Sequence, residues 1–375
     1  MKIDKSNWKI VKLVDVFTKK EENDKDNAKN RFDRFLKVNH MDAESLHIKS
    51  WASQKNGEEI NPTFYKIFRK GQILFPTRNP HLRRTVLADF DGICGEKTLT
   101  LEPNEEFLIP EFIPFLFHSE SFYAHTTGAI IGSTNPHCRW RDVASYEFLL
   151  PPKDQQAELA ELLWAIDDVV ESEYEVLNKL NINYASEKKN IYESNENKKI
   201  VLGESIDILS GFPFKSKLFN KNKDGIPLIR IRDISESKVE TFYSGEFNEK
   251  YLIKRGDLIV GMDGDFTLNI WDNENALLNQ RVLKISLKKD VSPLLFDYLI
   301  HFLQLELDRI HRGVGATTVK HLAVSDVRKI KLPIPENNLE IVINKLDLIS
   351  KNIINLESKI SSSKALQKSL INQVF

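Results

Sequence analysis

The sequence is poor in cysteine and lacks the residue spacings of a metal site. Only two of its 375 residues are cysteines, Cys94 and Cys138. Two cysteines cannot form a disulfide framework, so both are expected to be reduced thiols. The nine histidines make no recognisable pattern of metal ligands either. We therefore expect no metal bound by this chain.

Long apolar runs are also missing. The most apolar run, residues 107–117, is interrupted by Pro110, Glu111 and Pro114. No positively charged apolar leader opens the sequence, and a membrane-spanning helix needs about 20 consecutive apolar residues. These observations predict a cytoplasmic protein that makes no contact with a membrane.

The signatures of catalytic sites are absent as well. No Gly-x-x-x-x-Gly-Lys-Ser/Thr loop is present to hold a nucleotide phosphate. Residues 61–64, Asn-Pro-Thr-Phe, are superficially similar to the corner motif of amino-methyltransferases, but no glycine-rich cofactor turn accompanies them. Asp91, Asp263 and Asp265 lack the Asp, then Glu-x-Lys order common in metal-dependent nucleases. The sequence thus predicts neither catalytic residues nor a bound cofactor.

Charge is distributed unevenly along a chain whose formal net charge is only -1. Residues 151–198 carry an excess of acidic side chains, whereas residues 1–150 and 199–335 each carry a small excess of basic ones. An acidic segment is repelled by phosphate, while the two flanking segments can approach it. The charge pattern permits DNA binding without demonstrating it.

Two stretches have the apolar spacing of helices that pair along their length. In each, apolar residues recur in alternating steps of three and four, which is typical of a coiled-coil seam. Glu173 is the one charged residue in the first seam. Because each helix follows a globular segment, the second must run back along the first, and the pair is expected to be antiparallel. The interface residues are Leu163, Ile166, Val170, Leu177 and Leu180 in the first helix, and Leu346, Ile349, Ile353, Leu356 and Ile360 in the second.

The second half of the chain repeats the order of the first. Residues 69–74 correspond to 254–259, and Asp142-Val143 corresponds to Asp326-Val327. The repeat predicts an α+β protein with two tandem globular domains, separated and followed by long helices that pair. Residues 76–87 and 261–271 do not match, as expected if the domains read different targets. The expected parts are residues 1–150 and 197–335 for the domains, and 151–196 and 336–375 for the helices.

Several runs in the second half carry a family resemblance. They are Leu209–Ser216, containing Gly-Phe-Pro-Phe, then Gly225–Ile231, Leu278–Arg281, Gly313–Ala316 and Lys331–Pro335. In this order they resemble the DNA-specificity subunit of type I restriction-modification systems. The first domain departs from the pattern because it lacks the Gly-Phe-Pro-Phe run. The resemblance covers nearly the whole chain, since that family also alternates two target-recognition domains with two long helices.

The resemblance implies a function without catalysis. Each recognition domain would read one half of a bipartite, asymmetric site in double-stranded DNA, and the helices would set the spacer between the halves. The helices would also dock two adenine methyltransferase subunits, which use S-adenosylmethionine. Restriction and translocase subunits of the same complex would use ATP and Mg. Trp164, Val169, Ile343 and Ile354 are expected on faces that point away from the helix pair and remain available for such partners.

The candidate DNA-binding residues are hydrogen-bond donors that can reach base edges or phosphates. In the first domain they are Arg78, Asn79, His81, Arg83, Arg84, Ser133, Thr134, Asn135, His137 and Arg139. In the second they are Lys215, Arg230, Arg232, Asn279, Gln280, Arg281, Arg312, Thr317, Thr318 and Lys320. Arg230 and Arg232 alternate, which predicts that they share one face of a strand, and residues 317–320 suit a phosphate contact at a helix start.

Two other functions stay open at this point. One is a self-contained restriction endonuclease fragment, in which Asp263 or Asp265 would support magnesium-dependent cutting. The other is a coiled-coil scaffold with no role on DNA, because apolar helical spacing by itself is more often plain core than a docking surface.

Overall fold

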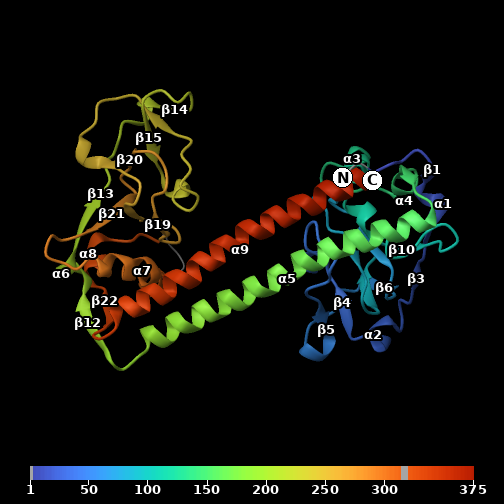
Figure 1. The fold of residues 1–375 in the computed structure, drawn as a ribbon, viewed down its shortest axis with the longest axis horizontal. Helices are drawn as coiled ribbons and strands as arrows, with labels where there is room; N and C mark the ends of the chain where they lie inside the picture. The colour runs from blue at the N-terminus through green and yellow to red at the C-terminus, as the bar shows by residue number, and fades with distance from the viewer. Residues whose placement is uncertain (1–2, 314–319) are drawn as a thin grey trace. The chain divides into compact units, whose positions relative to one another are not determined.

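The structure, a computed structural model, describes residues 3–313 and 320–375. Its contacts divide the chain into two compact units. The first unit contains the residues up to Val176 together with Leu356–Phe375, and the second contains Leu177–Asn355. The long helices α5 (Lys153–Tyr192) and α9 (Leu339–Val374) each contribute to both units (Figure 1). Two tandem domains with long helices after each are therefore confirmed.

The first unit is built from short strands and helices. In chain order before α5 these are β1 (Lys9–Lys12), α1 (Leu13–Val16), β2 (Phe17–Lys19), β3 (Glu22–Asn23), α2 (Ala28–Arg31), β4 (Arg34–Leu36), η1 (Val38–His40), β5 (Ala52–Ser53), η2 (Gln54–Asn56), β6 (Phe64–Phe68), β7 (Ile73–Pro76), η3 (Pro80–Leu82), β8 (Val86–Leu87), β9 (Gly92–Gly95), β10 (Thr98–Pro103), η4 (Ile113–His118), α3 (Glu120–Gly128), α4 (Trp140–Ala144) and β11 (Glu147–Leu150).

The second unit repeats this plan between α5 and α9. Its elements are β12 (Asn197–Val201), α6 (Leu202–Ser205), β13 (Ile206–Ser210), η5 (Ser216–Leu218), β14 (Phe219–Asn220), β15 (Ile226–Ile229), η6 (Ile231–Asp233), β16 (Phe242–Tyr243), η7 (Glu249–Tyr251), β17 (Leu252–Ile253), β18 (Leu258–Gly261), β19 (Leu268–Ile270), β20 (Ala276–Leu278), β21 (Val282–Leu287), α7 (Leu294–Gly313), α8 (Val324–Lys329) and β22 (Lys331–Pro335).

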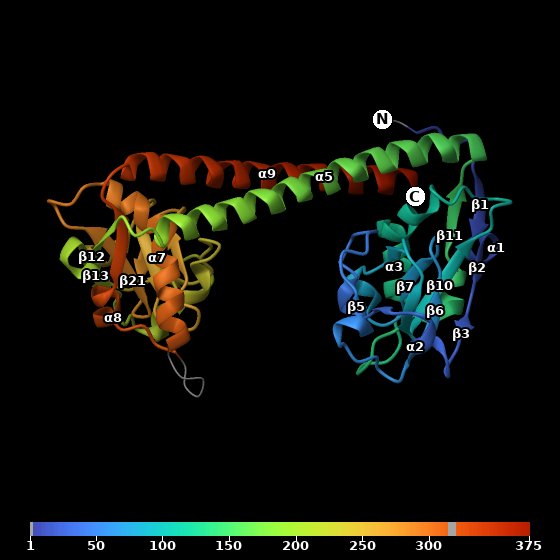
Figure 2. The ribbon, with the colours of Figure 1, turned by 90° about the horizontal axis from the view of Figure 1, so that it is seen from below.

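The sheets confirm that the two units share one topology. A two-stranded ladder, β1-β11 or β12-β22, closes each unit beside its long helix. A four-stranded sheet follows, in the order β2-β10-β7-β8 in the first unit and β13-β21-β18-β19 in the second. Each unit also has a five-stranded sheet with one parallel pair, β4 with β9 and β15 with β20. In the second unit α7 lies against the four-stranded sheet (Figure 2).

The core of the first unit is rich in aromatic side chains. Phe112, Phe115, Phe117 and Phe122 are each at most 1% exposed. They pack in one cluster with Leu163 of α5, and the C-terminal side chains of α9 complete that cluster: Leu370, Ile371 and Val374. Fully burying one such side chain contributes about 1.5–3 kcal/mol. The last turns of α9 are therefore part of this core.

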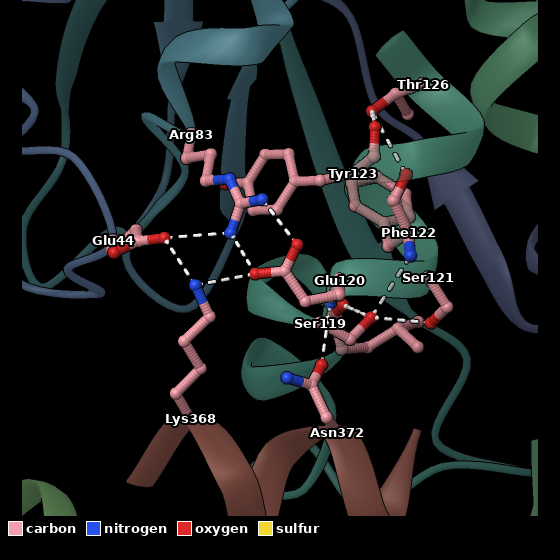
Figure 3. Close-up of polar contacts among 11 residues, drawn as sticks. Glu44, Arg83, Ser119, Glu120, Ser121, Phe122, Tyr123, Thr126, Lys368 and Asn372 are labelled. Carbon is pink, nitrogen blue, oxygen red and sulfur yellow. Dashed lines mark hydrogen bonds and ion pairs between the residues drawn. The ribbon is translucent and has the colours of Figure 1, made fainter. Parts of the chain in front are cut away.

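Polar contacts also hold the end of α9 in the first unit (Figure 3). Lys368 Nζ lies 2.6 Å from Glu120 Oε1 and 3.4 Å from Glu44 Oε1. Asn372 Oδ1 accepts a hydrogen bond of 2.8 Å from the backbone N–H of Glu120, an otherwise unpaired donor at the start of α3. Phe375 packs on the same core as Ile3. The second helix thus returns to the first domain, as its expected antiparallel course requires. This course also predicts that Phe375 ends near Met1, which lies outside the described residues.

The two long helices run antiparallel in the first unit, and they are also in contact in the second. In the first unit, Gln367 Nε2 donates to Asp167 Oδ1 at 2.8 Å. Farther along the same helix pair, Lys359 Nζ lies 3.2 Å from Glu173 Oε1. In the second unit, Lys345 Nζ lies 2.8 Å from Glu187 Oε2. As the position on α5 increases, the partner on α9 decreases, which confirms the expected direction.

The ten residues predicted for the helix interface are all at least partly buried, and their contact with the partner helix stays a prediction. Five of the ten predicted interface residues are buried and the other five are half-buried. The buried ones are Leu163, Val170, Leu346, Ile349 and Ile360; the half-buried ones are Ile166, Leu177, Leu180, Ile353 and Leu356. Charged residues interrupt both helices, and no helix in the described ranges has the length and apolar character that a membrane crossing requires.

Four residues were expected to face away from the helix pair, and for two of them this prediction is wrong. Ile343 is 3% exposed, because the core of the second unit also packs against the start of α9. Trp164 lies against Phe115 with ring centroids 4.9 Å apart, and its Nε1 donates to Glu111 O. Val169 and Ile354 are 49% and 60% exposed, as expected.

His47 links the first domain to α5 and is expected to make the free energy of unfolding depend on pH. The hydrogen bond to Asp167 is the main cause that raises the pKa of His47, with smaller contributions from the charges of Asp167 and Glu171. The stabilisation is therefore fully present below about pH 6.5 and is lost as pH rises through the raised pKa. Urea midpoints, followed by tryptophan fluorescence, should fall between pH 6 and pH 9.

Substituting the histidine should flatten that dependence. In His47→Gln the urea midpoint should change less between pH 6 and pH 9 than in the wild type. His81→Gln, on an exposed turn, is the matched control and should keep the wild-type slope. Equal slopes in the wild type and His47→Gln would contradict the assignment.

Glu173 predicts a stabilising substitution. Its side chain is buried in the helix pair, and neither carboxylate oxygen has a hydrogen bond among the described residues, although Lys359 is close. A buried ion pair of this kind is often no better than an apolar residue of similar size. Glu173→Leu should raise the free energy of unfolding by about 1–2 kcal/mol. Lys359→Met should lower it, because an unpaired buried carboxylate is left.

The control for this substitution is Glu175→Leu, which changes an exposed glutamate of the same helix. Both variants are compared with the wild type by denaturant unfolding. If Glu173→Leu is no more stable than Glu175→Leu, Glu173 does not weaken the seam.

Candidate nucleic-acid interface

The fold brings together the two candidate loops of the first unit. The chain leaves β7 at Pro76, and the backbone N–H of Asn79 donates to Pro136 O at 2.8 Å. His137 forms an isolated antiparallel bridge to Arg78 and a second one to Ile131. The loops that follow β7 and α3 therefore form one surface, which the sequence could not show because about 60 residues separate them.

Most candidates on this surface are open to solvent. Asn79 and His137 are half-buried because their backbones pair, and the exposed residues are Arg78, His81, Ser133, Thr134, Asn135 and Arg139. A concavity of about 380 Å³ adjoins them, lined by His137, Arg139 and Trp140 among others. It is also lined by Lys97, which the sequence analysis missed. The internal repeat could have identified Lys97, because Lys97 occupies in the first unit the position that Arg281 has in the second.

Arg83 and Arg84 differ from the other candidates because they point into the protein. Arg83 forms two ion pairs, with Glu120 and with Glu44, and its guanidinium lies over the ring of Tyr123 (Figure 3). The hydrogen bond from Arg83, with a second from Lys368, lowers the pKa of Glu120 to about 2. Arg84 donates to Val38 O at 3.0 Å. A DNA contact by either residue stays a prediction, and in this structure both have internal partners.

The second unit gathers its candidates around one concavity of about 550 Å³. Five of them line it, together with Pro213 and Phe214: Arg230, Arg232, Asn279, Gln280 and Arg281. Parallel pairing explains the gathering, since β15 and β20 are paired Ile229 to Leu278 and both end at the same sheet edge. Arg230 and Asn279 are the next residues of the two strands. Lys215 is exposed beside this edge, immediately before η5.

The glycine of the Gly-Phe-Pro-Phe run is required at this edge. A Cβ atom on Gly211 would lie 2.0 Å from the backbone oxygen of Asn279. That distance is far below van der Waals contact, so only glycine lets the two segments approach. Phe212 N–H then donates to Leu278 O at 2.9 Å. The run thus holds one wall of the concavity against the other.

The prediction that Arg230 and Arg232 lie on a strand is wrong. β15 ends at Ile229, and η6 begins at Ile231. The carboxylate of Asp233 turns the chain, because its Oδ2 accepts from Arg230 N–H at 2.8 Å. Asp233 is 4% exposed, and burial raises the pKa of its carboxyl. Both arginines remain exposed on the concavity.

The remaining candidates of the second unit lie near the end of α7. Arg312 is exposed in its last turn, and Lys320 Nζ donates to His311 O at 2.8 Å. Thr317 and Thr318 lie outside the described residues. Asp263 contacts His321 and Arg281, with His321 Nδ1 2.7 Å from its Oδ1. Asp265, by contrast, has a side chain that is 94% exposed. Among the described residues, no group of three or more side chains could hold a metal ion.

Comparisons with known proteins were made on the whole chain. The family model for the type I restriction modification DNA specificity domain matches it twice, at residues 5–181 and 195–362. The specificity subunit of the type I restriction enzyme EcoBI from Escherichia coli is 40% identical over 163 residues, which are 43% of this chain and 34% of that subunit. The specificity subunit of MjaVIII from Methanocaldococcus jannaschii is 26% identical over 259 residues, 59% of each chain. The matches thus span a third and about three fifths of these relatives.

Solved structures share the fold over almost the entire chain. A chain from a study of complex assembly in a type I R-M system matches with a TM-score of 0.60 and 19% identity, covering 98% of this chain and 97% of that one. The S subunit of a type I restriction-modification system from M. genitalium also gives a TM-score of 0.60, at 15% identity, covering 100% and 98%. At these identities the likeness concerns the fold.

Proposed function

The chain belongs to the type I restriction modification DNA specificity family, and we propose that it is the subunit that reads DNA sequence in a type I restriction-modification complex. Each unit reads one half of a bipartite, asymmetric site in double-stranded DNA. The helices α5 and α9 set the length of the unread spacer between the halves.

The observation that carries this proposal is the concavity of the second unit. Arginine, asparagine and glutamine are the side chains that make paired hydrogen bonds with base edges in the major groove. Arg230 follows β15, whereas Asn279, Gln280 and Arg281 lie between β20 and β21, and all four line one concavity. Arginines also bind phosphates, which supply much of the affinity of DNA-binding proteins. The same chemistry is present on the first unit, where Arg78 and Arg139 are exposed.

Exposed apolar residues on the long helices support docking of other subunits. In the first unit, Val169 and Val176 are each nearly half exposed. In the second unit, Ile182, Ile341, Leu348 and Ile354 are each at least 60% exposed. Exposed apolar groups of this size mark protein interaction sites when they cluster. We propose that two adenine methyltransferase subunits cover these helix faces.

The catalytic steps belong to those partner subunits under this proposal. The methyltransferase subunits use S-adenosylmethionine, and restriction and translocase subunits use ATP and Mg. This chain recognises the target sequence in DNA and contributes no catalytic residue. The nuclease alternative required Asp263 or Asp265 to bind Mg. An arginine and a histidine surround Asp263 instead, which disfavours a cation there.

Selection from random DNA tests the proposal. The full chain, together with an adenine methyltransferase subunit of a type I restriction-modification system, is mixed with double-stranded DNA of random sequence, and bound molecules are sequenced. Two short blocks of fixed sequence, separated by a gap of constant length and free composition, are expected. Absence of any preferred sequence would contradict DNA reading and favour the scaffold alternative. Magnesium-dependent cutting by the chain alone, lost in Asp263→Asn, would favour the nuclease.

Removing one heptad from both long helices tests the role of the spacer. Seven residues are two turns of a coiled coil, so a matched deletion from α5 and α9 keeps the seam in phase. The gap between the two DNA blocks should change while the bases within each block stay the same. Circular dichroism and a thermal unfolding curve check that the variant is folded. Altered bases within a block, with the gap unchanged, would contradict the spacer role.

A further inference from the structure

The two units share a corner with the same backbone structure. In the first unit, the corner consists of Thr77 and Arg78 after β7, Lys97 before β10, and His137 in the loop before α4. Thr77 N–H donates to Lys97 O at 2.9 Å, and Cys138 N–H donates to Thr77 O at 3.0 Å. Arg78 and His137 form an antiparallel bridge. Three separate segments thus meet at one point.

The second unit repeats every one of these contacts. Met262 N–H donates to Arg281 O at 2.9 Å, and Leu322 N–H donates to Met262 O at 2.7 Å. Asp263 and His321 form the antiparallel bridge. The corner therefore places Asp263 where the first unit has Arg78, Arg281 where it has Lys97, and His321 where it has His137.

The backbone also turns in the same way after each corner. Asn79 has φ 51° and Gly264 has φ 76°, both in the left-handed region. Asn79 N–H donates to Pro136 O at 2.8 Å, and Gly264 N–H donates to Lys320 O at 3.3 Å. Asparagine and glycine are the residues that adopt this conformation at least cost. The two corners therefore present their side chains from equivalent positions.

The side chains of the two corners differ in charge. The first corner carries Arg78, Lys97 and His137, and no carboxylate of the described residues forms an ion pair with Arg78. In the second corner, Asp263 Oδ2 lies 3.4 Å from Arg281 Nη1, and its Oδ1 lies 2.7 Å from His321 Nδ1. One arginine is thus exposed without a carboxylate, and the other is held by one.

Each corner borders the concavity of its unit. Lys97 and His137 line the one in the first unit, and Arg281 lines the one in the second. Arg78 is exposed, and the side chain of Arg281 is 53% exposed. The side chain of Asp263 is 22% exposed, and it contacts Arg281. A ligand in the concavity of the second unit can therefore reach Arg281, and Arg78 is exposed next to the corner residues that line the concavity of the first unit.

We propose that this corner is a specificity-determining position of each unit, at which Arg78 and Arg281 each donate to a guanine and Asp263 positions Arg281. The assignment rests on the proposed function in DNA reading and deepens it. Arg78 and Arg281 extend from different positions of the shared corner, because Arg281 corresponds to Lys97, so each unit places its guanine contact differently on the same backbone.

The chemistry of the second corner favours a DNA base over a phosphate as the ligand of Arg281. A carboxylate close to a phosphate is repelled, so Asp263 would weaken a pure phosphate contact. Guanine presents two acceptors, O6 and N7, to a planar guanidinium in the major groove. A carboxylate on Nη1 leaves the other donors of Arg281 available and restricts its rotamers before DNA binds. Arg78 makes the same contact without this support.

Base selection by variants of the full chain tests the corner. The full chain with its methyltransferase partner is applied to the random double-stranded DNA library, and preference is measured at each base position. Arg78→Ala should reduce discrimination for guanine at one position of one block by about tenfold, since it removes a paired contact to the base edge. Asp263→Asn should reduce discrimination at one position of the other block. All other positions should keep their preference.

Two exposed residues outside the corners serve as controls. Asp265→Asn removes a carboxylate two residues after Asp263, and Arg141→Ala removes an arginine of the first unit whose side chain is 70% exposed. Neither should alter any base preference. Thermal unfolding of all four variants separates loss of folding from loss of reading.

Several outcomes would overturn the assignment. A uniform loss of affinity for all sequences in Arg78→Ala, with a salt dependence smaller by about one phosphate contact, would make Arg78 a phosphate ligand. A lower melting temperature in Asp263→Asn with unchanged base preference would make Asp263 merely structural. A wild type that selects no sequence contradicts the proposed function itself. A wild type that selects two blocks, which neither variant alters, contradicts only the corner.

Discussion

The packing of the last turns of α9 into the first unit is the interaction on which the architecture depends. This unit is discontinuous, because its core needs Leu370, Ile371 and Val374 in addition to the residues before Val176. Lys368 adds a charged contact to Glu120, which Arg83 also holds. The apolar contacts contribute more than the ion pairs, because Lys368 and Glu120 are both nearly half exposed and solvent screens their attraction. The chain therefore completes its first domain with its last residues.

Duplication of the fold explains how one chain can carry two different recognition surfaces. Backbone hydrogen bonds define the corner in both units, and they do not depend on which side chains are present. Arg78 and Asp263 can thus occupy equivalent places with opposite charges. The loops outside the sheets tolerate such changes because their side chains are exposed and pack against little. A common scaffold with different exposed side chains is what reading two unrelated half-sites requires.

Periodicity and repetition in the sequence predicted the fold well. The seams were visible because burial on a helix recurs every three to four residues, and the tandem domains were visible because the chain repeats the same order. The prediction of which residues face away from the helix pair was correct for two of four residues. Ile343 is buried by α7 and the sheet of the second unit, and a helical period does not reveal a second neighbour of this kind. The strand predicted for Arg230 and Arg232 failed because Asp233, a buried cap, ends β15 early.

The candidate site was predicted as residue types and not as a surface. Arg83 looked like a DNA contact because it lies in a basic loop, yet Glu44 and Glu120 from distant segments surround it. Lys97 was missed because it lies outside residues 78–84 and 133–139, from which the DNA-binding candidates of the first domain were taken. For both Arg83 and Lys97, contacts between segments far apart in sequence determine whether the side chain is available to DNA. The gathering of Arg230 and Asn279 likewise depends on the parallel pairing of β15 with β20.

Hydrogen exchange of the backbone amides in α9 tests the central claim most directly. If the C-terminal part of this helix is core of the first unit, the amides of residues 360–371 should exchange about as slowly as those of β10 in the same unit. Exchange at the rate of an isolated, fraying helix, while β10 stays protected, would show that the first domain is complete without α9 and would contradict the account.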